Sequence, residues 1–251
     1  MNKIDRIAIW RDTVEKCDSG KFKNLETCES EFFYANDRRF NNINMMVPNN
    51  NIITKIHILN EDVLIVAEKL HKSGEQKILV LNLASWQVSG GGVRNGCMAQ
   101  EEEIFRRSNY FRSFDDRYHP LKKGESVYTP TVAIIKDKYY NDLSDPFYVS
   151  MLAMPGIKHP ILTSDNKFSD KDYYSMCQII ENIFKISILT KHDVLILGSI
   201  GCGAYGCPPE EVAKIFNVYL KKYNGFFRTV IFAILSKSDD NFDIFNKLIK
   251  K

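Results

Sequence analysis

The stretch KILVLNLASWQVSGGGVRNGCMAQEEE, residues 77–103, decides the fold. It begins with the apolar run 77–84, which is typical of a central strand that is buried on both faces. The run leads to three glycines, Gly90 to Gly92, and after seven more residues to Gln100 to Glu102. Glycines allow a backbone to approach a ligand closely and to turn its N–H groups toward phosphate oxygens. We therefore expect a phosphate-type loop with carboxylates beside it.

A second glycine loop has the same setting. The segment GSIGCGAYG, residues 198–206, follows the apolar run 194–199 and precedes a helical pattern that starts at Pro208. Loops that leave the carboxyl ends of parallel strands gather at one edge of an open α/β sheet, where ligands bind. Both glycine loops are therefore expected to face the same crevice.

Strand and helix patterns alternate along the rest of the chain, which favours an α/β domain around a mostly parallel sheet. Asn60 is expected to cap the helix that ends at Gly74, and residues 36–51 are expected to form a loop. The expected strands are 51–59, 77–84, 127–136, 148–154, 194–199 and 228–235. The expected helices are 7–17, 61–72, 170–187, 208–223 and one near 242–248.

Length and composition limit the class of protein. A chain of 251 residues can bury one substantial core, and we expect a single domain with an N-terminal helical extension (1–50) packed on the main body (51–251). The net charge of +3 gives no strong nucleic-acid signal. Six scattered cysteines without a secretory signal favour a cytosolic or nuclear protein with reduced thiols. No apolar run is long enough for a membrane span.

Three other interpretations of the glycine loops are weaker. Residues 201–206 fit G-x-G-x-x-G, but a dinucleotide fold needs an acidic residue about 20 positions on, and Asp239 is too far along. Neither loop continues as Gly-Lys-Ser/Thr, which a P-loop requires. Cys202 and Cys207 lack a second pair of metal ligands, so packing explains them better than zinc. We expect no metal and no cofactor.

The acidic run Glu101 to Glu103 has two interpretations. It can be a helix N-terminus, where carboxylates interact favourably with the helix dipole. Its distance of seven residues from a phosphate-type loop also keeps it close to any ligand. Like charges beside an anion raise the pKa of a carboxyl group, as a general acid requires. Cleavage of a glycosidic bond uses such an acid, so the ligand is expected to be a sugar that carries phosphates.

The triple glycine, the seven-residue spacer and Gln100 to Glu102 resemble the signature of poly(ADP-ribose) glycohydrolases of the macrodomain superfamily. The resemblance to the microbial branch covers nearly the whole chain. It includes LNLAS at 81–85, NG at 95–96, YTPTVAIIKD at 128–137 and LGSIGCGAYGCPPEEVA at 197–213. It implies a three-layer α/β/α macrodomain with a mixed, mostly parallel sheet that holds ADP-ribose at the strand ends.

The resemblance also implies roles for single residues. Glu102 matches the catalytic acid that protonates the leaving ribose oxygen, and Glu101 matches the carboxylate that holds the ribose hydroxyls. Tyr205 matches an aromatic residue that packs on the sugar, in a second loop that closes over the diphosphate. The residues expected to bind substrate are Gly90, Gly91, Gly92, Val93, Asn95, Gln100, Ser199, Gly201, Gly203, Ala204, Tyr205 and Gly206.

Three positions depart from the family pattern. Ser85 stands where animal enzymes have an Asn, Arg94 replaces a residue that is usually apolar, and Cys207 replaces a common Asn.

The expected reaction is hydrolysis of ribose–ribose O-glycosidic bonds in poly(ADP-ribose), with release of ADP-ribose. Two alternatives stay open at this point: hydrolysis of mono-ADP-ribosylated protein or nucleic acid, and binding of ADP-ribose without cleavage.

Overall fold

The computed structural model describes residues 1–49, 52–236 and 239–250. In this part of the chain a mixed seven-stranded sheet has the order β1-β4-β5-β3-β6-β7-β2. The strands from β5 to β2 in this order are parallel neighbours, whereas β4 is antiparallel to both β1 and β5. The strands are β1 (Glu31–Phe33), β2 (Lys55–Leu59), β3 (Ile78–Leu83), β4 (Ser126–Lys136), β5 (Asp142–Met154), β6 (Val194–Leu197) and β7 (Thr229–Ala233).

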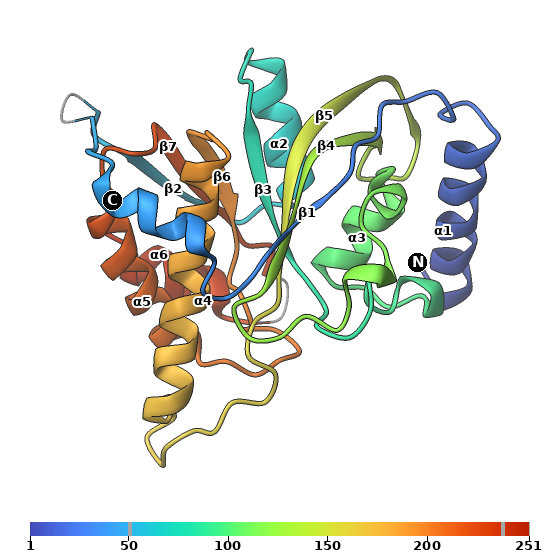
Figure 1. Ribbon diagram of the computed structural model, residues 1–251. Helices are drawn as coiled ribbons and strands as arrows, with labels where there is room; N and C mark the ends of the chain where they lie inside the picture. Colours follow the sequence, from blue (N-terminus) through green and yellow to red (C-terminus); the bar gives the residue numbers. More distant parts are fainter. Residues whose placement is uncertain (50–51, 237–238, 251) are drawn as a thin grey trace.

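Helices cover both faces of the sheet, so the fold has the expected three layers (Figure 1). One outer layer contains α1 (Lys3–Asp18), α2 (Val63–Lys72) and α3 (Gln100–Arg106). The other contains α4 (Asp170–Leu189), α5 (Pro209–Lys222) and α6 (Asn241–Leu248). The short 3₁₀ helices are η1 (Arg38–Met45), η2 (Val93–Asn95), η3 (Tyr110–Arg112) and η4 (Asp116–Tyr118).

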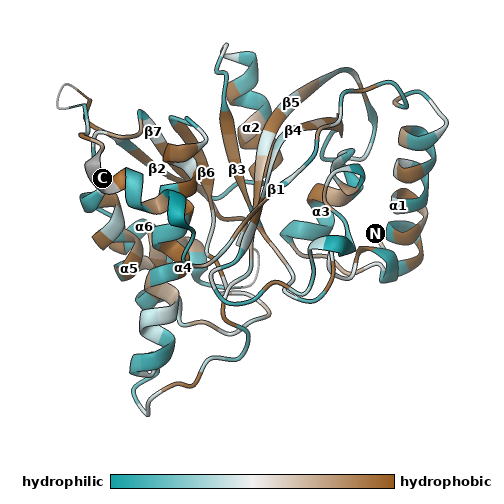
Figure 2. Cartoon of the chain, viewed as in Figure 1, coloured by the Kyte–Doolittle hydropathy of each residue, from teal (hydrophilic) through white to brown (hydrophobic). Residues whose placement is uncertain are grey.

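The central strand β3 shows why the layers form. Ile78 and Val80 pack in the core beneath α1, α2 and α3, whereas Leu79 and Leu81 pack in the core beneath α4 and α5. Successive side chains of a strand point to opposite faces, so an unbroken apolar run needs cover on both sides. Figure 2 shows the apolar colouring concentrated in the strands and on the inward sides of the helices.

The two glycine loops leave adjacent strands. The first follows β3 and the second follows β6, and these strands pair in parallel. The expectation that both loops lie at one edge of the sheet is therefore confirmed.

The N-terminal segment is helical only in part. Residues 31–33 form β1, which pairs with β4 and extends the sheet. Three residues are too few for an alternating pattern, so this strand was not predicted from the sequence. The proposed boundary between residues 50 and 51 falls outside the described residues, and the division into 1–50 and 51–251 stays a prediction.

Three further expectations are corrected. Asp62 caps α2 by accepting hydrogen bonds from the N–H groups of Leu64 and Ile65, so Asn60 is not the cap. The expected loop 36–51 contains η1, whose Phe40 is buried in the core. Strand β5 begins at Asp142 because its first half pairs with β4.

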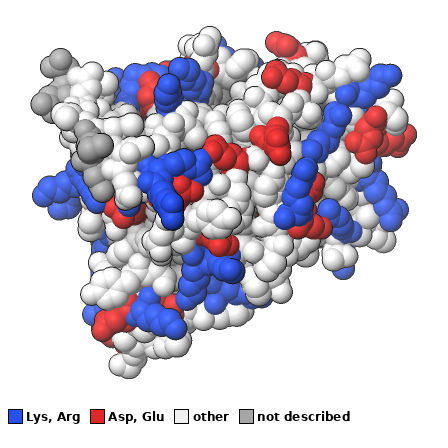
Figure 3. Space-filling view, viewed as in Figure 1, with Lys and Arg blue, Asp and Glu red and all other residues white. Residues whose placement is uncertain are grey.

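Basic and acidic side chains are interspersed on the face that Figure 3 shows, without one dominant sign. In the described part of the chain, none of the helices combines the length and apolar character that a bilayer crossing requires.

Candidate active site

Helix α3 carries the acidic run at its first turn, directly after the first glycine loop. Glu101 and Glu102 are buried, with 3% and 7% of their surface exposed. Both carboxylates turn back toward the triple glycine. A Cβ placed on Gly91 would lie 2.5 Å from Glu102 Oε1 and 3.0 Å from Glu101 Oε2. The two carboxylates therefore flank a single glycine, which places two acidic groups at one point of the loop.

Glu102 is held through both carboxylate oxygens. Its Oε1 accepts a hydrogen bond from Gly92 N at 2.8 Å, and its Oε2 accepts one from Ala99 N at 2.7 Å. Ala99 is the N-cap of α3 and Glu102 is its third residue, where a carboxylate can satisfy the cap N–H. The helix start itself thus fixes the side chain of Glu102.

Glu101 is held by hydrogen bonds from other residues than those that hold Glu102. Its Oε2 accepts a hydrogen bond from Ser85 N at 2.7 Å, and its Oε1 accepts longer bonds of 3.3 Å from Asn82 Nδ2 and Gly90 N. The pKa of Glu101 is raised to about 8, mainly by burial and also by the neighbouring charge of Glu102, whereas the hydrogen bonds from Ser85, Asn82 and Gly90 oppose this rise. A carboxyl group with a raised pKa was expected in this run, and Glu101 is one.

The third residue of the acidic run faces away from the glycines. Glu103 Oε1 pairs with Arg106 Nη2 at 2.7 Å, and its Oε2 accepts a hydrogen bond from the Tyr140 hydroxyl at 2.6 Å. Glu103 therefore stabilises α3 and its surroundings, and only the first two glutamates meet at the loop.

The triple glycine is shaped by these contacts. Gly90 and Gly91 have φ values of +70° and +52°, which favour glycine over other residues. A Cβ on Gly90 would lie 2.5 Å from the Phe105 ring, and one on Gly92 would lie 2.4 Å from the Cys97 sulfur. A larger residue at Gly90 or Gly92 would therefore require the side chain of Phe105 or Cys97 to move.

The N–H groups of the triple glycine point at protein oxygens. Gly90 and Gly92 donate to the two glutamates as described, and Gly91 donates to the carbonyl of Val88 at 3.2 Å. Two of the three N–H groups are therefore bonded to the carboxylates at the start of α3, and contact of the loop N–H groups with phosphate stays a prediction. Contact of the glycines with a substrate through other atoms stays a prediction.

The other residues predicted in the first loop differ in position. The Val93 side chain is fully buried in the core, and a contact of its backbone with substrate stays a prediction. Gln100 is bonded through its side chain to the backbone of β3, with Leu83 N at 2.7 Å and Leu81 O at 2.9 Å. Asn95 is exposed. A substrate contact of Asn95 stays a prediction, whereas Gln100 anchors α3 to the sheet.

Tyr205 brings the second glycine loop against the first. Its hydroxyl accepts a hydrogen bond from Trp86 N at 3.1 Å. Burial raises the pKa of Tyr205, and the charges of Glu101 and Glu102 act in the same direction. The charges of both carboxylates therefore act on the Tyr205 hydroxyl. The hydrogen bond between Trp86 and Tyr205 also shows that the structure brings the two predicted loops together.

The outer part of the second loop is open. A Cβ placed on Gly203 or Gly206 meets no atom within 4 Å, and Ala204 is exposed. The inner part is packed, because Gly201 lies so close to Gly156 that a Cβ on Gly156 would be 2.8 Å from its Cα. The substrate contacts of Ser199 and of these loop residues stay predictions.

Three residues near the carboxylates were not identified as site residues from sequence. Asn82 and Ser85 hold Glu101, and the fully buried Arg106 donates to Cys97 O at 2.7 Å. Asn82 does carry a signal, because it is the one polar side chain within β3. An amide in an otherwise apolar buried strand needs a partner, and here the partner is Glu101.

Helix α1 braces the first loop from outside. Arg6 Nε donates to Gly96 O at 2.6 Å, and Thr13 Oγ1 donates to Arg106 O at 2.6 Å. Gly96 has φ +70°, and a Cβ there would lie 2.6 Å from Lys3 O. The N-terminal helix therefore supports the site without reaching the carboxylates.

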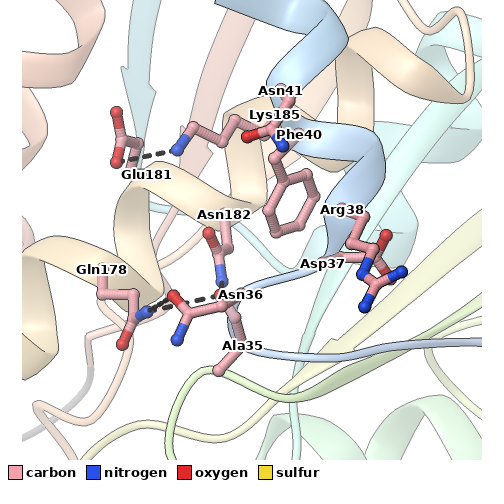
Figure 4. A pocket seen from close by; sticks show the side chains of 10 residues that line it. All are labelled: Ala35, Asn36, Asp37, Arg38, Phe40, Asn41, Gln178, Glu181, Asn182 and Lys185. Carbon is pink, nitrogen blue, oxygen red and sulfur yellow. Dashed lines mark hydrogen bonds and ion pairs between the residues drawn. The ribbon is translucent and has the colours of Figure 1, made fainter.

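Neither a metal cluster nor the pocket of Figure 4 belongs to this site. No group of three metal-binding side chains occurs among the described residues. The thiol of Cys207 is buried and donates to Ile157 O.

The pocket in Figure 4, about 240 Å³ between η1 and α4, lies on the sheet face opposite α3. Its polar groups bond to one another, as Gln178 does with Asn36 and Lys185 with Glu181.

Comparison with known families gives one match. The family model "Microbial-type PARG, catalytic domain" matches residues 11–137, which is about half of the chain and includes the first glycine loop with both glutamates. Sequence comparison with the curated proteins gives no significant match.

Solved structures with the same fold include bacterial poly(ADP-ribose) glycohydrolases (PARG). The enzyme of Thermomonospora curvata is 21% identical with a TM-score of 0.82, over 98% of this chain and 99% of that chain. Its complex with the inhibitor ADP-HPD is 21% identical with a TM-score of 0.79, over 97% and 98%. The enzyme of Deinococcus radiodurans in complex with ADP-ribose is 20% identical with a TM-score of 0.75, over 87% and 93%.

Proposed function

Because the chain belongs to the family of microbial-type poly(ADP-ribose) glycohydrolase catalytic domains, and is thus a glycosidase, we propose that Glu102 is its general acid and base. The observation that carries this assignment is the pair of buried carboxylates at Gly91. Glu102 is positioned by two backbone N–H groups of the loop and the helix start, and Glu101 is held by β3 and Ser85. A fixed carboxylate is what acid–base catalysis needs.

The proposed reaction cleaves the ribose–ribose bond of poly(ADP-ribose). The carboxyl group of Glu102 protonates the ribose oxygen of the leaving unit, and the bond from this oxygen to the anomeric carbon breaks. The remaining ribose passes through an oxocarbenium-like state. Water then attacks the anomeric carbon while the Glu102 carboxylate takes its proton, which restores the acid. The products are ADP-ribose and a shortened polymer with a free hydroxyl.

Glu101 is proposed to hold the hydroxyls of the reacting ribose. It is bonded to Ser85 and Asn82, so its position does not depend on Glu102. The second loop is proposed to bind the diphosphate through Gly203 to Gly206, because its outer glycines leave open space. The relatives in complex with the inhibitor ADP-HPD and with ADP-ribose support a ligand of this kind.

The assignment is tested with Glu102→Gln. Positioned acid–base catalysis contributes about 10²- to 10⁴-fold, so release of ADP-ribose from labelled polymer should fall by at least this factor. Affinity for ADP-ribose, measured by calorimetry, should stay within about threefold, since the amide has nearly the same size. The matched control is Glu103→Gln, whose side chain faces Arg106 and Tyr140. Undiminished turnover of Glu102→Gln would remove the assignment.

Polymer is proposed as the preferred substrate over a singly modified protein. Rates on labelled polymer and on a mono-ADP-ribosylated peptide should be compared at equal concentration of ADP-ribose units. Faster release from the peptide would assign the chain to mono-ADP-ribosyl hydrolysis.

The cysteines, which are all free thiols in the structure, support the proposal of a cytosolic or nuclear compartment.

A further inference from the structure

A pocket lined by aromatic side chains lies beside the carboxylate site. It has a volume of about 400 Å³ and lies between β1 with its continuation and the segment 117–125. Phe32 and Tyr34 line one side, and Tyr118 and His119 line the other. Phe32 and Tyr34 contact each other edge to face, with ring centroids 5.0 Å apart, and 64% of Tyr34 is exposed. We call this hollow the aromatic pocket.

The aromatic pocket is bonded to the loop that holds Glu101. His119 Nε2 lies 3.2 Å from Ser85 O, and Ser85 N donates to Glu101 at 2.7 Å. Leu121 N also donates to Trp86 O at 2.8 Å. Two hydrogen bonds and the single residue Ser85 thus link a wall of the pocket to the buried carboxylate.

The pocket combines flat rings with cations at its rim. Lys122 and Arg117 line it, and the Arg117 guanidinium lies 5.5 Å from the centroid of the Tyr118 ring. Glu125 also lines it, but its Oε2 accepts a hydrogen bond from Lys122 N, so this carboxylate is bonded to the backbone. Burial lowers the pKa of His119, which keeps its ring neutral. Stacking rings beside Lys and Arg suit a nucleotide, whose base stacks and whose phosphates are anionic.

The position of the pocket relative to the strands indicates which nucleotide unit of the substrate can reach it. In the order of strands, β6 and its glycine loop lie on one side of β3, whereas β4 and β1 lie on the other. If the diphosphate of the cleaved unit extends toward the β6 loop, the leaving side of the scissile bond faces β4 and β1. The pocket lies on this second side.

We propose that the aromatic pocket binds the adjoining ADP-ribose unit of the polymer, on the leaving side of the bond that is cut. Its adenine stacks between the ring of Tyr34 and the 118–120 wall, and its phosphates meet Lys122 and Arg117. This inference rests on the proposed function. It makes the pocket a determinant of polymer preference, because a singly modified protein has no adjoining unit.

The test compares two substrates that differ only beyond the scissile bond. One is labelled poly(ADP-ribose), and the other is an aryl glycoside of ADP-ribose, which has a small leaving group. Loss of a base–aromatic stack corresponds to about 5- to 100-fold. Tyr34→Ala should therefore lower kcat/KM for the polymer by at least about fivefold and leave that for the aryl glycoside within about twofold. Lys122→Ala should act in the same direction and weaken the dependence of polymer cleavage on salt.

The matched control is Tyr139→Ala. Tyr139 is 70% exposed and lies in the turn between β4 and β5, at the other end of these strands. It should leave both rates unchanged. Equal losses on both substrates, or no loss on the polymer, would overturn the inference. A loss on a mono-ADP-ribosylated peptide as large as that on the polymer would assign the pocket to the peptide and overturn it too. If the wild-type protein cleaves neither substrate, the proposed function itself fails.

Discussion

The two glycine loops leave neighbouring strands of the same sheet, yet the protein closes one and leaves the other open. In the first loop, Gly90 to Gly92 contact the side chains of α3, and their N–H groups are bonded to protein oxygens. In the second loop, a Cβ added at Gly203 or Gly206 would have no atom within 4 Å. Glycine thus serves close packing in one loop and open space in the other.

The difference between the loops fits the proposed function, in which the first loop positions the carboxylates and the second loop binds the ligand. The proposed general acid Glu102 needs a fixed position, and the first loop and the helix start supply it through hydrogen bonds. The same loop also donates a hydrogen bond to Glu101. A loop that receives a ligand needs free surface, and the second loop has it. The link between the loops is the hydrogen bond from Trp86 N to the Tyr205 hydroxyl. Four substitutions or conditions sharpen or break this comparison.

The largest effect is expected for Gly91→Ala. The added methyl would lie 2.5 Å from Glu102 Oε1, at a φ of +52° that costs about 1–2 kcal/mol for other residues. Displacement of a catalytic group by about 1 Å lowers turnover by roughly 10²-fold. Steady-state rates on labelled polymer and the free energy of unfolding should both fall. A stable variant with full turnover would show that the first loop does not position the carboxylates.

The next effect is a pH dependence of stability that comes from Glu101. Burial raises the pKa of Glu101 from its ordinary value of 4.5 to about 8, so the folded state keeps a proton that the unfolded state loses. This contribution to stability is complete below pH 4.5 and is lost as the pH rises toward 8. Its size is on the order of a few kcal/mol.

The measurement is denaturant unfolding of the wild type and Glu101→Gln between pH 5 and 8. The variant lacks the ionisable group, and its free energy of unfolding should fall less over this range. Parallel pH profiles for the two proteins would contradict the burial of an ionisable carboxyl group at this position.

A smaller effect is expected for Gly203→Ala, the counterpart of Gly91→Ala in the open loop. The methyl group meets no protein atom, so the free energy of unfolding should change by less than about 0.5 kcal/mol. The methyl does occupy the space proposed for the diphosphate, and the affinity for ADP-ribose should fall several-fold in calorimetry. Lower stability with unchanged affinity would reverse the roles of the two loops.

The smallest effect is expected for Tyr205→Phe. It removes one hydrogen-bond acceptor, at a cost of about 0.5–1.5 kcal/mol, but keeps the ring. Affinity for ADP-ribose should fall by less than about twofold, because the ring that is proposed to pack on the sugar is retained, and Tyr205→Ala should have a larger effect. Equal affinities for the Phe and Ala variants would exclude packing of the ring on the sugar.

Local patterns made much of this site predictable. The apolar run of β3, the glycines after it and the acidic start of α3 are consecutive in sequence, and each imposes its own geometry over a few residues. The position of both loops at one edge followed from the parallel pairing of β3 and β6. The acidic run could therefore be placed beside the glycine loop before any contact was known, whereas the separate roles of Glu101 and Glu102 came from the resemblance to the glycohydrolase family.

Contacts between distant segments were not predictable. The run of three glutamates does not indicate which side each carboxylate faces. In the structure, Glu101 is bonded to Asn82 and Ser85. Glu103 is bonded to Arg106 and Tyr140. Strand β1 is three residues long and depends on β4 for its hydrogen bonds. The use of the glycine N–H groups by the glutamates also depends on how α3 is placed against the loop. These features arise from tertiary packing.

The most direct test of the division between the loops is a crystal structure of Glu102→Gln with ADP-ribose bound. The terminal ribose should contact Glu101 and residue 102, and the diphosphate should lie against residues 203–206. The side chains of Glu101 and residue 102 should keep the positions described above. A diphosphate held by the N–H groups of Gly90 to Gly92, with the carboxylates displaced from them, would contradict the assignment of fixed chemistry to the first loop and binding to the second.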